Sequence, residues 1–173
     1  RNTDKKRYMA NVSIAFDILP WLNVSGRAKV DNTNSIFTQK LYASSNTTIT
    51  EGSTQGHYTE IRNTDEQIYA DVMVNINKTF ADNKFSLVAN VGASINDTKS
   101  KELSYRGPIR EVGIPNMFTV FDLDKEKSRP QKYGWQEQTQ SIFASVEMGY
   151  KSMLYLTVTG RNDWASQLAG SPQ

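Results

Sequence analysis

The sequence of 173 residues lacks cysteine and has only one histidine, His57. The absence of cysteine excludes a disulfide framework, a cysteine-based zinc site, an iron–sulfur cluster and a thiol nucleophile. The histidine lies in a segment rich in serine, threonine and glycine, with no partner for a catalytic triad or a metal site. We therefore expect His57 to be a solvated surface residue.

The sequence also lacks an excess of one charge and any long apolar run. Twenty basic residues stand against eighteen acidic ones, and a net charge of +2 gives no signature of nucleic-acid binding. The mean hydropathy is −0.57, and no apolar run approaches the ~18 residues of a transmembrane helix. The charged residues 1–7 contain no apolar core of a signal peptide. Composition alone would place the chain among soluble, polar proteins.

The order of the residues points elsewhere, because apolar side chains recur at every second position in six segments. This alternation indicates β-strands with one apolar face, and it does not fit a helix, where residues two apart point in different directions. The apolar positions include no charged residue, whereas the positions between them carry Asp17, Arg27, Lys29, Asp71 and Glu147. We predict strands at about residues 6–19, 22–32, 65–80, 84–96, 138–150 and 153–164.

The connections between these strands alternate between very short and very long. Tight turns at residues 20–21, 82–83 and 151–152 join the strands in pairs, whereas residues 33–64 and 97–137 form connections far longer than hairpin loops. In an antiparallel meander, the short turns then lie at one end and the long loops at the other. This asymmetry is typical of transmembrane β-barrels, which have short periplasmic turns and long extracellular loops.

Aromatic residues flank the short turns, as in the girdle that such barrels place at the lipid–water interface. The alternative is that aromatic residues simply favour strand ends and hairpins. The residues concerned are Phe16, Trp21, Phe80, Phe85, Tyr150 and Tyr155.

Six strands of this kind would leave two unpaired edges and one continuous apolar face. Unpaired backbone groups in lipid cost several kcal/mol each, and in water the apolar face exceeds what soluble monomers expose. We therefore expect an all-β, antiparallel up-and-down meander in which residues 1–173 form a fragment of one transmembrane β-barrel domain.

Residues 150–166, YKSMLYLTVTGRNDWAS, resemble a signature in the barrel of SusC-like TonB-dependent outer-membrane transporters. Residues 114–118, IPNMF, resemble an element that precedes the same strand pair in that family. The resemblance covers about residues 108–170, with Ala165 standing where many members have serine. It implies a structural role for the signature residues Arg161, Asn162, Asp163 and Trp164. We expect Arg161 and Asp163 to share the inward face and to form a salt bridge.

The resemblance implies a plugged barrel of the 22-stranded type in the Gram-negative outer membrane, with this chain supplying about a quarter of the wall. It also implies a plug domain and a TonB-contacting segment, neither of them within residues 1–173, and a SusD-like lipoprotein lid. The implied activity is import of oligosaccharides, or of peptides in some members, energised through TonB. The expected partners are therefore the lid, the TonB complex, outer-membrane lipid and the substrate. We expect no cofactor, no metal, no catalytic residue and no nucleic-acid partner.

The second long loop is rich in aromatic and polar side chains. Such side chains stack on sugar rings or pack against a protein partner, and the alternative is that they fold the loop on itself. The candidate substrate- or partner-binding residues are Tyr105, Phe118, Phe121, Tyr133 and Trp135.

Charged residues allow further interpretations. Residues 122–126, DLDKE, lack the glycine and the terminal glutamate of a calcium loop, so a solvated acidic stretch is favoured. The inward charges Arg27, Lys29, Asp71 and Glu147 either pair, with one another or with a plug, or are solvated in a wet lumen.

Three other functions are weighed against active import. A passive porin would have no plug, and a soluble β-rich carbohydrate-binding or adhesion module would need a second layer over the apolar face. A glycosidase would need paired acids on neighbouring inward positions, which the spacing of Asp71 and Glu147 does not demonstrate.

Overall fold

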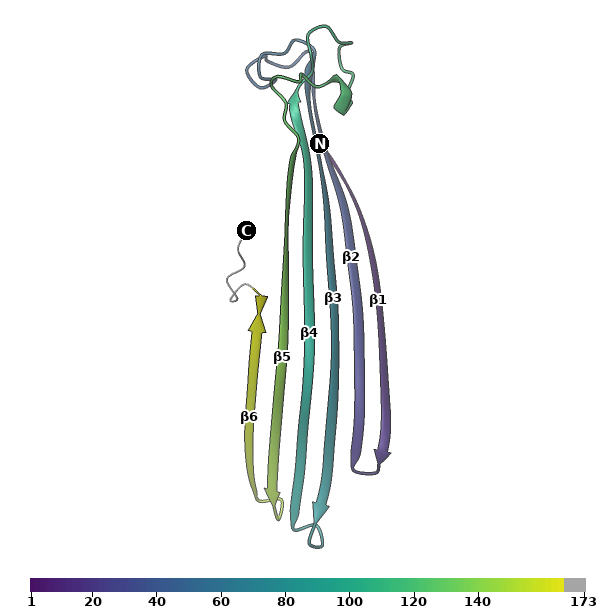
Figure 1. Cartoon of the computed structure of the whole chain (residues 1–173), viewed down its shortest axis with the longest axis vertical. Helices are drawn as coiled ribbons and strands as arrows, with labels where there is room; N and C mark the ends of the chain where they lie inside the picture. The colour runs from purple at the N-terminus through teal and green to yellow at the C-terminus, as the bar shows by residue number, and fades with distance from the viewer. Residues whose placement is uncertain (167–173) are drawn as a thin grey trace. The chain divides into compact units, whose positions relative to one another are not determined.

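The computed structural model describes residues 1–166. These residues form a six-stranded sheet in which each strand lies beside its neighbours in sequence (Figure 1). The predicted all-β, antiparallel meander is therefore confirmed. The elements are β1 (Asn2–Leu19), β2 (Leu22–Tyr42), β3 (Gly56–Phe80), β4 (Phe85–Pro108), the 3-10 turn η1 (Val120–Asp122), β5 (Gln131–Tyr150) and β6 (Leu154–Ala165).

The strands continue further from the short turns than the apolar alternation predicts. The predicted loops at residues 33–64 and 97–137 are wrong in extent, because only residues 43–55 and 109–130 lie between the long strands. Beyond the apolar alternation, β2 to β5 carry polar residues on both faces. The period-two contrast therefore disappears from the sequence, although the backbone ladder continues.

The chain divides into two compact units. The loop unit contains Arg1–Tyr8, Asn32–Glu66 and Lys99–Trp135, and with them both long connections. The turn unit contains Met9–Asp31, Gln67–Thr98 and the described part of Gln136–Gln173, and with them the three short connections.

In the turn unit, the short turns lie at one end of the sheet (Figure 1). The β3–β4 turn holds Ala81, Asp82 and Asn83 in the left-handed region, with φ of 52°, 52° and 65°. The β5–β6 turn does the same at Lys151 and Ser152. Consecutive left-handed residues match the twist of an antiparallel hairpin, which explains how such short connections join long strands.

The aromatic residues beside the short turns do not all lie on one face of the sheet. The rings of Phe85 and Tyr150 lie 5.0 Å apart beside the turns. Tyr155 lies opposite Gly149 in the β5–β6 ladder, in the pair next to that of Tyr150 and Leu154. Because adjacent pairs point to opposite faces, Tyr155 does not belong to the apolar face of the girdle.

The two units bury very different side chains. The alternating apolar residues of the turn unit stay exposed, including Val12 at 62%, Phe16 at 67% and Leu156 at 64%. In the loop unit, Ile109 and Leu123 are 1% and 6% exposed and form a small core. None of the helical residues in the described range forms a segment long and apolar enough to cross a membrane.

Candidate functional site

The polar face of the turn unit brings together Arg27 of β2 and Asp71 of β3. The Arg27 Nε lies 3.2 and 3.0 Å from the two carboxylate oxygens, and Nη2 lies 3.0 Å from Oδ2. The Asp71 side chain is 1% exposed, whereas that of Arg27 is 58% exposed. The structure therefore pairs these two predicted inward charges. Part of the Arg27 guanidinium group, with its N–H donors, remains exposed to solvent.

The other two predicted inward charges have different neighbours. The Lys29 Nζ lies 3.7 Å from Asp31 Oδ2 on the same strand. The Glu147 carboxylate accepts a hydrogen bond of 3.2 Å from the hydroxyl of Thr157 on β6. Asp71 and Glu147 thus have separate partners and do not form the facing carboxylate pair that a glycosidase needs.

The signature residues of β6 divide between the two faces of the sheet. Arg161 and Asp163 are ion-paired, with Nε 2.8 Å from Oδ1, and Arg161 Nη2 donates to Ser141 Oγ at 3.1 Å. The predicted salt bridge is therefore present. Asn162 lies opposite Ile142 in the strand register, so Asn162 and Trp164 share the apolar face.

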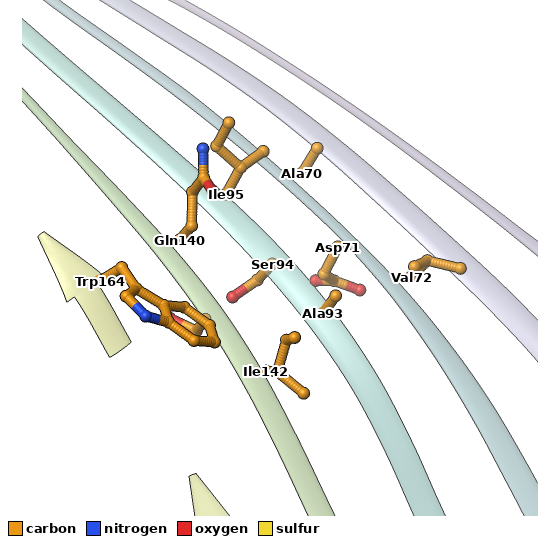
Figure 2. Close-up of a pocket in the computed structure, with 10 residues that line it drawn as sticks. Ala70, Asp71, Val72, Ala93, Ser94, Ile95, Gln140, Ile142 and Trp164 are labelled. Atoms are coloured by element: carbon orange, nitrogen blue, oxygen red, sulfur yellow. The ribbon is translucent and has the colours of Figure 1, made fainter. Parts of the chain in front are cut away.

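The apolar face carries a groove of about 480 Å³ beside Trp164, shown in Figure 2. The groove is lined by the small side chains of Ala70 and Ala93 and by the larger ones of Ile142 and Trp164 (Figure 2). A groove lined mainly by apolar side chains offers few hydrogen bonds to a sugar or a peptide. We therefore look for substrate contacts on the opposite face.

The five aromatic candidates do not form one site. The Phe118 ring packs edge-on against Tyr42 at 5.1 Å, and Lys40 Nζ lies 5.5 Å from its centroid. Phe118 therefore packs against β2 and not against other residues of its own loop. Tyr105 lines a cavity of about 270 Å³ that also includes Val120 and Leu123.

The other three candidates are more exposed. Phe121 is 87% exposed at the surface of the loop, and Tyr133 and Trp135 are 67% and 42% exposed on β5. Tyr133 and Trp135 are two residues apart in one strand, so they share a face. These two rings are therefore placed to present a joint aromatic surface.

The expectation that His57 is solvated is wrong. The residue is 6% exposed, and its Nε2 lies 3.4 Å from Glu51 Oε1. The two long connections cover it because they are hydrogen-bonded to each other: Ser53 Oγ donates to the Ile109 carbonyl at 2.7 Å. The Ile109 amide also donates to the Gly56 carbonyl at 2.9 Å. Local sequence composition does not indicate such hydrogen bonds between distant loops, so the burial of His57 could not be predicted from it.

The acidic stretch at residues 122–126 is engaged within its own loop. Asp122 accepts hydrogen bonds from Arg110 Nη2 at 3.1 Å and from the Thr119 hydroxyl at 2.5 Å. Asp124 accepts one from the Glu126 amide at 2.9 Å. Across residues 1–166, no group of three or more histidine, aspartate or glutamate side chains is arranged to hold a metal ion.

A polar chain on β3 was not singled out from the sequence. The Tyr58 hydroxyl donates to Glu60 Oε2 at 2.5 Å, and Arg62 Nε donates to Glu60 Oε1 at 2.6 Å. Burial, followed by the hydrogen bond to the Glu60 carboxylate, raises the pKa of Tyr58 to about 12. Burial would raise the pKa of Glu60, but the hydrogen bonds from Tyr58 and Arg62 outweigh it and lower that pKa.

A basic cavity on the loop unit was also missed. It has a volume of about 280 Å³ and is lined by Glu51, Ser104, Arg106, Lys127, Arg129 and Gln131. Its members come from three separate segments, and only the closure of the two long connections brings them together. The only signal in the sequence was a cluster of cations around residues 125–132.

No protein-family model and no curated protein matches the chain. Among solved structures, the chain is similar to one described as the RagAB peptide transporter, with a TM-score of 0.75 and 18% identity over 95% of this chain. Structures of the RagAB peptide importer in its open-open and closed-closed states give TM-scores of 0.72 and 0.70 at 16% and 18% identity. The match covers 18% of each of those chains. At this identity the likeness establishes the fold of the sheet.

Proposed function

We propose that this chain is a wall segment of an outer-membrane β-barrel transporter of the SusC-like type. The observation that carries the proposal is the apolar face of the turn unit. Its large side chains, such as those of Val12, Phe16 and Val158, are exposed, and the alternating apolar segments that carry them include no charged residue at the apolar positions. Water disfavours such a face, whereas lipid accommodates it.

The opposite face supports an aqueous lumen. It carries the Arg27–Asp71 and Arg161–Asp163 ion pairs and the Glu147–Thr157 hydrogen bond. Ionised side chains at membrane depth need either partners or water, and here they have partners on neighbouring positions. The division into one apolar and one polar face supports the proposal, because transmembrane barrels are apolar outside and polar inside.

The proposed cargo is an oligosaccharide or a peptide. The signature at residues 150–166 supports the SusC-like assignment, and the fold shared with the RagAB peptide importer favours peptide. In this proposal a SusD-like lipoprotein covers the extracellular loops, and TonB energises import through a plug that lies outside residues 1–173. The present residues make no covalent step. They exclude lipid, line the passage and hold the loops.

Uptake and membrane partitioning test the proposal. The full-length protein that carries this segment should fractionate with the outer membrane and need detergent for extraction. Uptake of labelled oligopeptides or oligosaccharides should require both the protein and TonB. TonB-independent uptake would favour a passive porin instead, and extraction by high salt without detergent would favour a soluble β-rich binding or adhesion module.

A further inference from the structure

Three cations surround the basic cavity of the loop unit without a protein counterion. Among residues 1–166, no ion pair joins Arg106, Lys127 or Arg129 to a carboxylate. Glu51 lines the same cavity, but its carboxylate is engaged by His57 at 3.4 Å. The cavity therefore holds an excess of positive charge.

Two other arginines of the loop unit, in contrast, form ion pairs with carboxylates. Arg62 pairs with Glu60 at 2.6 Å, and Arg110 pairs with Asp122 at 3.1 Å. The fold thus supplies carboxylates to neighbouring arginines and not to those of the cavity. Like charges held around one concavity repel each other and lower the energy of an anion that enters it.

The cavity opens on a defined face of the sheet. Ser100 of β4 donates to Asp65 of β3 at 2.7 Å, and Ser104 and Arg106 follow Ser100 at even spacing. Residues at even spacing in one strand share a face, so Ser100, Ser104 and Arg106 lie on one face of β4. Gln131 lines the cavity and lies at even spacing from Tyr133 and Trp135 on β5, so the three residues share a face.

We propose that this basic cavity binds carboxylate groups of an anionic substrate on its way into the barrel. The inference rests on the proposed transport function and narrows its substrate class. Arginine and lysine provide charge-assisted hydrogen bonds to carboxylates, while Ser104 and Gln131 add neutral donors. Tyr133 and Trp135 supply ring faces for the uncharged body of the ligand. The carboxylates belong either to an acidic peptide or to an oligosaccharide of uronic acids.

The test measures binding to the purified full-length protein in detergent. The probes are hexaglutamate against hexaglutamine, and hexagalacturonate against a neutral galactose hexamer. The test variant combines Arg106→Gln, Lys127→Gln and Arg129→Gln. The matched control combines Lys99→Gln, Lys101→Gln and Lys132→Gln, which removes the same charge from the same part of the sheet. Lys101 lies on the other face of β4, because a Cβ on Gly134 would lie 3.8 Å from Lys101 Cγ.

The wild type should bind one anionic probe about tenfold more tightly than its neutral counterpart at low salt, and added salt should weaken the preference. The test variant should lose this preference, and the control should keep it. The probe that shows the preference identifies the source of the carboxylate. The Arg106→Lys and Arg129→Lys double variant keeps the charge and should retain most of the preference, which separates charge from misfolding.

Three results would overturn the inference. If the wild type binds and imports neutral and anionic probes equally, the cavity does not select carboxylates, although transport still stands. If the test variant and the control bind the anionic probe alike, its charges do not contact the ligand. If neither probe class is bound or imported, the proposed transport function itself fails, and the inference fails with it.

Discussion

The turn unit and the loop unit are built from the same strands but solve the burial problem in opposite ways. The turn unit leaves Phe16, Val158 and Leu156 more than half exposed, whereas the loop unit buries Ile109 and Leu123 almost completely. The loop unit also closes its two long connections on each other through Ser53 and Ile109. The turn unit therefore leaves its apolar side chains uncovered by the described chain, whereas the loop unit buries its apolar side chains through its own contacts.

The strongest way to break this contrast is a charge on the apolar face. Val158 is 62% exposed and pairs with Val146 near the middle of the β5–β6 ladder. Val158→Arg should destabilise the full-length barrel by about 2–4 kcal/mol, because an arginine near the bilayer midplane must leave water. Thr159→Arg places the same charge on the adjacent, opposite face and should have much less effect. Heat-modifiable migration in gels measures the folded fraction, and equal losses in both variants would contradict a lipid-facing surface.

A backbone change should affect the loop unit alone. Gly56 has a φ of +115°, and an added Cβ would lie 2.6 Å from the Leu41 carbonyl oxygen. Gly56→Ala should destabilise this unit by about 1–3 kcal/mol through backbone strain. The expected readout is faster hydrogen exchange and proteolysis within residues 43–58, with the strands of the turn unit still protected.

Gly160 offers the matched control, because an added Cβ there meets nothing within 4 Å. Gly160→Ala should leave both exchange and proteolysis unchanged. Uniform loss of protection in Gly56→Ala would show that the two units unfold as one.

The third prediction concerns the contribution of the Arg27–Asp71 ion pair to the stability of the turn unit. Arg27→Met would leave the Asp71 carboxylate, which is 1% exposed, without its guanidinium partner. The free energy of unfolding should fall by about 1–2 kcal/mol. This is the lower part of the range for a buried polar group that loses its partner, because the Arg27 side chain is itself half exposed. Lys29→Met removes a looser pair at 3.7 Å and should cost less. Denaturant midpoints compare the two, and a larger loss for Lys29→Met would refute this ranking.

The smallest expected effect concerns Tyr58 in the loop unit. Its pKa is raised from 10.0 to about 12, so the protonated phenol is favoured in the folded state. The resulting stabilisation is complete below pH 10 and is lost as the pH rises from 10 to about 12. Tyr58→Phe should lower the free energy of unfolding by about 1 kcal/mol at neutral pH. In a titration of tyrosine ionisation followed by ultraviolet absorbance, it should remove the one step at high pH that belongs to Tyr58.

Glu60→Gln provides the control for that titration. It removes the negative charge that opposes ionisation of Tyr58 but keeps the burial, which is the larger cause. The late step should therefore move to lower pH without disappearing. An unchanged titration in both variants would mean that Tyr58 is not held by Glu60.

Sequence reasoning captured the features that repeat locally. The alternation of Ile142, Ala144 and Val146 and the short turn after Tyr150 fix strand type and pairing, and both are present in the structure. Arg161 and Asp163 could be paired from the sequence because they are two residues apart on one face. The meander was therefore accessible from the sequence alone.

Features built by distant segments were not accessible in this way. His57 is buried by loops whose contact through Ser53 and Ile109 spans 56 residues. Phe118 faces Tyr42 for the same reason, so its aromatic character alone did not reveal a packing role. The basic cavity combines Glu51, Arg106 and Lys127 from separate segments. Contacts between segments that are far apart in the chain produce no periodic pattern in the sequence, so they could not be predicted from one.

The polar extensions of the strands have a consequence for how the sheet assembles. Thr64 donates to Asn34 at 2.9 Å, and Ser100 donates to Asp65 at 2.7 Å, which ties β3 to both neighbours through bonds that form in water. A slip of one residue would turn every side chain of a strand to the other face, and in the proposed barrel it would carry Asp71 into lipid. Under that proposal the extensions act as an alignment guide, because their hydrogen bonds set the strand register outside the bilayer.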